Sequence, residues 1–194
     1  VNPFASYGTP KKGDFLYKDL TGDGVIDDND KYAVGHGLAP RLTYGFSLGA
    51  EWNGFDFSCL FQGNAGLQVY WQDKFYMGYI NYGDVINKEI AEGAWREGRT
   101  NATYPRLLTG LNTLNAQPSD FWVQNKSYLR LKNVQIGYKI PKKLLQKLDI
   151  SQLRLYTSLE NMLTFTSYKG IDPEISGTTY PTMKQITVGV NVVF

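Results

Sequence analysis

The chain has 194 residues, of which 42% are hydrophobic, 14% aromatic and 20% charged, with a formal net charge of +2. This near balance of charge, without a basic stripe, argues against a nucleic-acid partner, and the single cysteine, Cys59, excludes an internal disulfide. No run of about 18 apolar residues occurs, which excludes a helical membrane protein. The many Tyr and Gly residues favour β structure rich in turns.

An acidic loop over residues 19–30 is the first pattern along the chain, and it matches the EF-hand calcium loop closely. A structural Ca²⁺ would be held by carboxylate and hydroxyl oxygens and by the carbonyl at the seventh position, while Gly24 allows the sharp turn. The expected ligands are Asp19, Thr21, Asp23, Val25, Asp27 and Asp30. The alternative is a solvated acidic turn without a metal.

Two alternating segments follow, residues 41–52 and 55–62, with apolar side chains on one face and polar ones on the other. Asn53-Gly54 separates them, and this dipeptide favours a type I′ turn because both central residues need positive φ. The sequence therefore predicts a β-hairpin over 41–62.

The connection over residues 63–126 is long and rich in aromatic residues between Tyr70 and Trp122. A short amphipathic helix is predicted over 84–95. Trp71 and Trp122 flank the expected loop-to-strand transitions, which makes them weak candidates for contact with a ligand or a partner protein. The alternative is that these aromatic residues pack the loops together.

Three further strands are predicted over residues 127–140, 152–165 and 183–194, with one helical turn at 142–147. Leu129 and Leu131 have the opposite phase to Val134 and Ile136, which a bulge near Asn133 would reconcile. The terminal strand alternates over about ten residues, the length that a tilted strand needs to cross a bilayer. Short turns on one side and long loops on the other are typical of an outer-membrane barrel.

An enzyme is not predicted. His36 is the only histidine, so no Ser-His-Asp, Cys-His or zinc arrangement can be built around it. Asp172 and Glu174 could be the paired carboxylates of a glycosidase. They flank Pro173 in a loop, however, and a turn contact is the favoured interpretation.

Several motifs together resemble one family over nearly the whole chain. They are Asp19–Asp30, Thr43-Tyr-Gly-Phe46, Ser127-Tyr-Leu-Arg-Leu-Lys-Asn-Val134, Asn161-Met-Leu-Thr-Phe-Thr166 and Gly170-Ile-Asp-Pro-Glu174. The sequence resembles the C-terminal part of a SusC/RagA-type TonB-dependent outer-membrane transporter of Bacteroidetes. The resemblance implies a barrel of about 22 strands with an internal plug, a SusD-like surface lipoprotein as a lid, and TonB-driven import of oligosaccharides or peptides.

The expected organisation is an all-β segment of a transmembrane barrel in the cell outer membrane. Residues 1–40 and 63–126 are extracellular loops, 41–62 a hairpin, and 127–194 the last three strands. Because the smallest barrels have about eight strands, we expect the other strands, the plug and the TonB-contacting segment upstream. The alternative is a soluble calcium-dependent β-sandwich that binds carbohydrate, in which Phe46, Phe57, Leu155 and Val190 would be buried in a core instead of facing lipid.

Overall fold

A computed structural model describes residues 4, 7–35, 37, 39–71, 79–80, 86–109, 113–146, 149–175 and 179–194, so His36 lies outside the described residues. The chain divides into two units: residues 1–35 with 70–123, and residues 36–69 with 124–194. No helix among the described residues is long and apolar enough to span a membrane.

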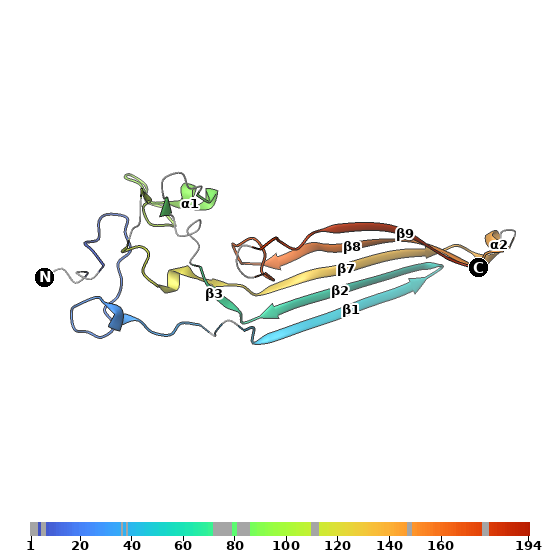
Figure 1. The fold of residues 1–194 in the computed structure, drawn as a ribbon, viewed down its shortest axis with the longest axis horizontal. Coiled ribbons are helices and arrows are strands. Elements are labelled where there is room, and N and C mark those ends of the chain that lie inside the picture. Colours follow the sequence, from blue (N-terminus) through green and yellow to red (C-terminus); the bar gives the residue numbers. More distant parts are fainter. Residues whose placement is uncertain are drawn as a thin grey trace. The chain divides into compact units, whose positions relative to one another are not determined.

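The second unit is a five-stranded antiparallel sheet in the order β1-β2-β7-β8-β9 (Figure 1). The strands are β1 (Leu42–Trp52), β2 (Phe55–Ala65), β7 (Tyr128–Lys139), β8 (Gln152–Thr166) and β9 (Gln185–Val193). The one-turn helix α2 (Lys142–Leu145) lies between β7 and β8, within the predicted helical turn. The predicted hairpin and the three later strands are thus confirmed.

The β1–β2 connection is a two-residue turn. Asn53 has φ 49° and Gly54 has φ 87°, the positive pair that a type I′ turn requires. Trp52 pairs with Phe55 directly across it. This turn fixes the register of the hairpin.

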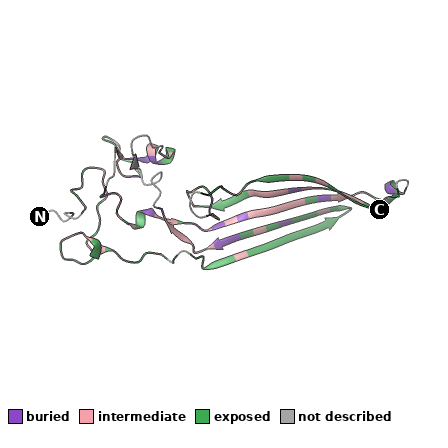
Figure 2. Cartoon of the chain, viewed as in Figure 1, coloured by how far each residue is buried: buried purple, intermediate pink, exposed green. Residues whose placement is uncertain are grey.

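The register places nearly all of the large apolar side chains of the sheet on one side, here called the apolar face. Its large exposed members include Trp52, Val188 and Phe165, which are 78%, 77% and 58% exposed. Most residues of β1 and β9 are accordingly exposed in Figure 2. The apolar face consists of Leu42, Tyr44, Phe46, Leu48, Trp52, Phe55, Phe57, Cys59, Phe61, Leu129, Leu131, Val134, Ile136, Tyr138, Leu153, Leu155, Leu159, Leu163, Phe165, Ile186, Val188, Val190 and Val192.

A bulge in β7 keeps this face continuous. The pairing of β2 with β7 steps from Leu60↔Asn133 to Phe61↔Leu131, so Lys132 is the extra residue. The bulge returns Leu129 and Leu131 to the apolar face, as the sequence predicts. β8 carries a matching irregularity that was not predicted, because its pairing with β7 steps from Glu160 to Leu163 and Asn161 has φ 53°.

The opposite side of the sheet, here called the polar face, carries the charged and amide side chains. Near the Asn53–Gly54 turn, Arg154 of β8 reaches across β7 to Asp56 of β2, with Nε 2.8 Å from Oδ2. It passes over Gly137 of β7, where a Cβ atom would lie 2.5 Å from the guanidinium. The missing side chain at Gly137 is what allows this ion pair to span three strands.

The first unit is built mainly from loops around two small cores. Its elements are η1 (Asp28–Asp30), α1 (Lys88–Gly93), η2 (Asp120–Trp122) and the parallel pair β4 (Tyr79–Ile80) and β5 (Leu108–Thr109). Ile90, Tyr104 and Trp122 form one core, and Phe4, Ile26 and Leu114 form the other. A separate two-stranded sheet pairs β3 (Gln68–Tyr70) with β6 (Val123–Asn125).

The helix predicted over 84–95 is shorter than expected. α1 begins after Asn87, whose side chain caps Glu89 N–H at 2.8 Å. It ends at Gly93 because the next residues pair elsewhere: Trp95 N–H donates to Tyr104 O at 3.0 Å. Residues 84 and 85 lie outside the described residues.

Replacing Gly54 with Ala is expected to lower the free energy of unfolding by about 1–2 kcal/mol. The positive φ strains any L side chain, and the new Cβ would lie 3.1 Å from Lys139 O. Gly49→Ala is the matched control, since its Cβ would meet only Phe57 O at 3.6 Å. Urea unfolding followed by tryptophan fluorescence measures both, and equal losses would contradict a special role for the turn.

Candidate functional site

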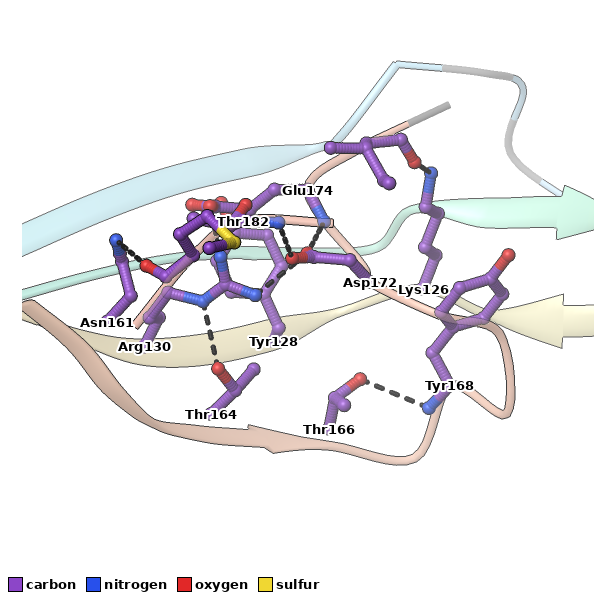
Figure 3. Close-up of polar contacts among 12 residues, drawn as sticks. Lys126, Tyr128, Arg130, Asn161, Thr164, Thr166, Tyr168, Asp172, Glu174 and Thr182 are labelled. Atoms are coloured by element: carbon purple, nitrogen blue, oxygen red, sulfur yellow. Dashed lines mark hydrogen bonds and ion pairs between the residues drawn. The ribbon is translucent and has the colours of Figure 1, made fainter. Parts of the chain in front are cut away.

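The most buried charges of the sheet lie where the β8–β9 connection meets the polar face (Figure 3). Arg130 of β7 is the centre, and its side chain is only 4% exposed. Its Nη2 lies 2.7 Å from Asp172 Oδ1 and its Nη1 lies 2.5 Å from Glu174 Oε2. Its Nε donates to Thr164 Oγ1 of β8 at 2.8 Å, so one guanidinium joins a strand neighbour to two loop carboxylates.

The neighbours of Arg130 on β7 bind one of the same two carboxylates, that of Glu174. Lys132 Nζ lies 2.7 Å from Glu174 Oε1, and Tyr128 OH donates to that oxygen at 2.8 Å. Lys126, just before β7, donates from Nζ to the carbonyl of Ile175 and lies 5.6 Å from the ring centroid of Tyr168. Cations and hydroxyls from one strand therefore converge on one loop.

Asp172 is ionised in this setting. Burial by itself raises the pKa of its carboxyl group, but hydrogen bonds from Arg130 and from the backbone N–H groups of Glu174 and Thr182 outweigh burial, and the pKa is lowered. Glu174 N–H donates to Asp172 Oδ1 at 2.9 Å, which is the turn contact that the sequence favours. Both carboxylates are occupied by cations and donors, an arrangement unlike a glycosidase pair that needs one carboxyl group protonated.

The predicted calcium loop uses its carboxylates to satisfy its own backbone. Asp19 accepts from Gly22 N–H at 2.6 Å and from Gly24 N–H at 2.8 Å. Asp30 accepts from Leu20 N–H at 2.7 Å and from Asp27 N–H at 2.8 Å. The hydrogen bond from Asp27 N–H is the main cause that lowers the pKa of Asp30, so this carboxylate is charged at neutral pH.

Among the described residues, no group of three or more Asp, Glu, His or Cys is placed to hold a metal ion. The oxygen-rich donor set suits calcium chemically. To bind an ion, the carboxylates would have to turn away from the backbone N–H groups that they now accept from. Asp23 is one example, because it accepts a hydrogen bond from Val25 N–H at 2.8 Å. Calcium binding at this loop stays a prediction.

Both tryptophans suggested as contacts for a transported substrate are buried. Trp71 is 5% exposed and Trp122 is 1% exposed. Trp122 packs with Ile90 and Tyr104 in a core of the first unit, and Phe15 and Phe121 lie edge-on to its ring at 5.9 and 4.8 Å. This burial favours the packing alternative, and a contact between Trp122 and a substrate would require this core to open.

The chain is similar in sequence to several TonB-dependent receptors. No family model matches. TonB-dependent receptor P3 of Formosa agariphila is 31% identical over 96% of this chain and 20% of its own length, and TonB-dependent receptor P39 is 32% identical over 94% and 19%. TonB-dependent receptor SusC of Bacteroides thetaiotaomicron is 26% identical over 92% and 17%.

Solved structures agree with these relatives. The RagAB peptide importer in its open-open state aligns with a TM-score of 0.67 and 29% identity, over 88% of this chain and 19% of the other. A second structure, of the RagAB peptide transporter, aligns with a TM-score of 0.64 and 28% identity over 86% and 20%. The chain thus spans about a fifth of the length of the proteins it matches.

Adding calcium to the metal-free receptor that contains this chain is expected to protect the 19–30 loop from proteolysis, with a Kd of about 10⁻⁴–10⁻³ M by calorimetry. The Asp19→Asn/Asp23→Asn double variant should lose both effects. Asp120→Asn, at an exposed carboxylate outside the loop, is the matched control. Unchanged proteolysis and no calcium-dependent heat in the wild type would leave the solvated turn as the correct interpretation.

Proposed function

The chain is homologous to SusC/RagA-type TonB-dependent receptors over about nine-tenths of its length, and we propose that it forms five adjacent strands of the barrel of such an importer in the outer membrane. The homology identifies a receptor and not an enzyme. The single observation that carries the membrane assignment is the apolar face, on which large side chains from all five strands remain exposed.

An apolar surface of this extent is unfavourable in water, and monomeric soluble proteins rarely leave one uncovered. β1 and β2 have 11 residues each, about the length that a tilted strand needs to cross the hydrocarbon layer. Lipid would cover the apolar face, and the polar face would line the barrel interior.

The two outer strands also need partners. β1 and β9 stand at the two edges of the sheet, so each has a row of backbone groups without a neighbour in the described sheet. In hydrocarbon such an edge costs several kcal/mol for each unsatisfied group. The remaining barrel strands of the receptor would pair with both edges. The plug and the TonB-contacting segment would come from other parts of the same receptor.

The substrate proposed for the complete importer is an oligosaccharide or a peptide, delivered by a SusD-like surface lipoprotein. The aligned solved structures are of a peptide importer, which supports this class of cargo. The long connections leave the sheet at the end opposite the Asn53–Gly54 turn. That end would face outward, where a surface lipoprotein can meet it.

A soluble β-sandwich fits the structure less well. Its core would bury the residues that alternate inward, yet Phe46, Phe57, Leu155 and Val190 are 47%, 41%, 45% and 59% exposed. Within the described ranges, the other strands form only two-stranded sheets, which are too small to cover a five-stranded one.

Val190→Lys is expected to lower the stability of the folded barrel in detergent by about 1–2 kcal/mol, because the ammonium group would lie on the lipid-facing side, at the level of Trp52 and Phe55 and so between the midplane and the interface. Thr187→Lys is the matched control, since Thr187 lies on the polar face of the same strand. Urea titration with heat-modifiable mobility on gels measures both variants. A smaller loss for Val190→Lys than for Thr187→Lys would reverse the assignment of the two faces.

An affinity tag on the receptor that contains this chain is expected to recover a surface lipoprotein from detergent-extracted outer membranes. Intact mass spectrometry under denaturing conditions identifies the polypeptides, and a tagged outer-membrane protein of another family controls for nonspecific recovery. Recovery of the tagged polypeptide alone, in a fraction that needs no detergent, would contradict the importer proposal.

A further inference from the structure

The described residues of the β8–β9 connection, 167–175 and 179–184, include a segment that folds back over the polar face of the sheet. We call these described residues the latch loop. Tyr128 and Arg130 alternate with Leu129 and Leu131, which lie on the apolar face, so the first pair points to the polar side. Asp172 and Glu174 of the loop bind that pair directly. Figure 3 shows these loop carboxylates beside the strand residues that bind them.

The latch loop is held at several positions along its length, and its ion pairs with Arg130 are largely buried. Asp172 and Glu174 side chains are 5% and 15% exposed, and Arg130 is 4% exposed. Near the end of the loop, Asn161 Nδ2 of β8 donates to Met183 O at 3.0 Å. The described part of the loop is therefore held from several strand positions and not by a single contact.

Ion pairs between the loop and β7 favour the folded-back position of the loop over a position away from the sheet. Arg130 and Lys132 both take their ion-pair partners from the latch loop. Lifting the loop would leave Arg130 at a strand position without its carboxylates and would move Asp172 from guanidinium to water. Lifting the loop would break several charge-assisted hydrogen bonds at once, and such bonds are roughly twice as strong as those between neutral groups.

We propose that the latch loop is a fixed constriction inside the outer end of the barrel, fastened to the wall by Arg130 and Lys132. The inference rests on the proposed function, in which the polar face lines the interior. A loop held on that face occupies part of the cross-section that cargo must pass. It therefore limits which molecules reach the deeper part of the barrel, and breaking its ion pairs widens the entrance.

The test places one cysteine on the latch loop of the whole receptor in intact cells. Ile171→Cys, at a side chain that is 63% exposed, is made in a background in which Cys59 and any other cysteine are replaced by Ala. A small charged maleimide should label it, whereas a polyethylene-glycol maleimide too large to enter a barrel should not. Adding Asp172→Asn and Glu174→Gln should speed labelling by the large reagent by at least about tenfold.

Two controls separate the possible failures. Glu51→Gln removes an exposed carboxylate that lies 3.4 Å from Lys139 at the other end of the sheet, and it should leave the labelling unchanged. Tyr32→Cys, at a side chain that is 66% exposed in the first unit, should react with both reagents because the proposed function places it outside the cell. An unreactive Tyr32→Cys would count against the proposed function and not against the latch.

Two results would overturn the latch. The first is rapid labelling of Ile171→Cys by the large reagent while both carboxylates are intact and Tyr32→Cys reacts normally. The second is no change in that labelling when the carboxylates are removed. Heat-modifiable mobility confirms assembly of each variant, and Lys132→Gln, which removes one ion pair from the edge of the network, replaces the double variant if that variant does not assemble.

Discussion

A sheet with one apolar face must cover that face with something other than water, and this constraint governs the rest of the molecule. The five strands bury almost none of their large apolar side chains against one another, because those side chains point to a side where the described sheet has no layer. Among the described residues, the apolar cores are the two small ones of the first unit. Stability of the sheet therefore depends on its backbone ladder and on its surroundings.

The polar face complements this arrangement with ion pairs at both ends. Arg154 and Asp56 join β8 to β2 near the short turn, and Arg130 binds Asp172 and Glu174 near the long connections. Between them lie small or amide side chains such as those of Ser58, Gln135, Ser158 and Thr187. The ion pairs at the two ends thus connect β8 with β2 and β7 with the β8–β9 connection, which contacts on the apolar face do not do.

Local patterns were sufficient to predict the strands, the type I′ turn and the bulge of β7. Alternation of apolar and polar side chains shows which residues of each strand share a face. The change in this alternation after Leu131 indicates the bulge, in which Lys132 is the extra residue. The ion pairs of Arg130 escaped prediction because Asp172 lies 42 residues away, and no local signal links them. Packing of the aromatic residues was named as an alternative, but the partners of Trp122, such as Phe15 and Ile90, come from distant segments and could not be read from the sequence.

The position of residues 70–123, the larger part of the first unit, between β2 and β7 has a consequence for the order of folding. Within the five-stranded sheet, the pairs β1–β2, β7–β8 and β8–β9 join strands that follow one another along the chain. β2 and β7, in contrast, must meet across the residues from Gly66 to Ser127. Closing so long a loop is entropically slow unless its ends are brought together first. Trp71 N–H donates to Trp122 O at 2.8 Å inside the first unit, so folding of that unit would shorten the effective loop to a few residues on each side. Prior folding of the first unit would thereby turn the slowest strand pairing into a nearly local one.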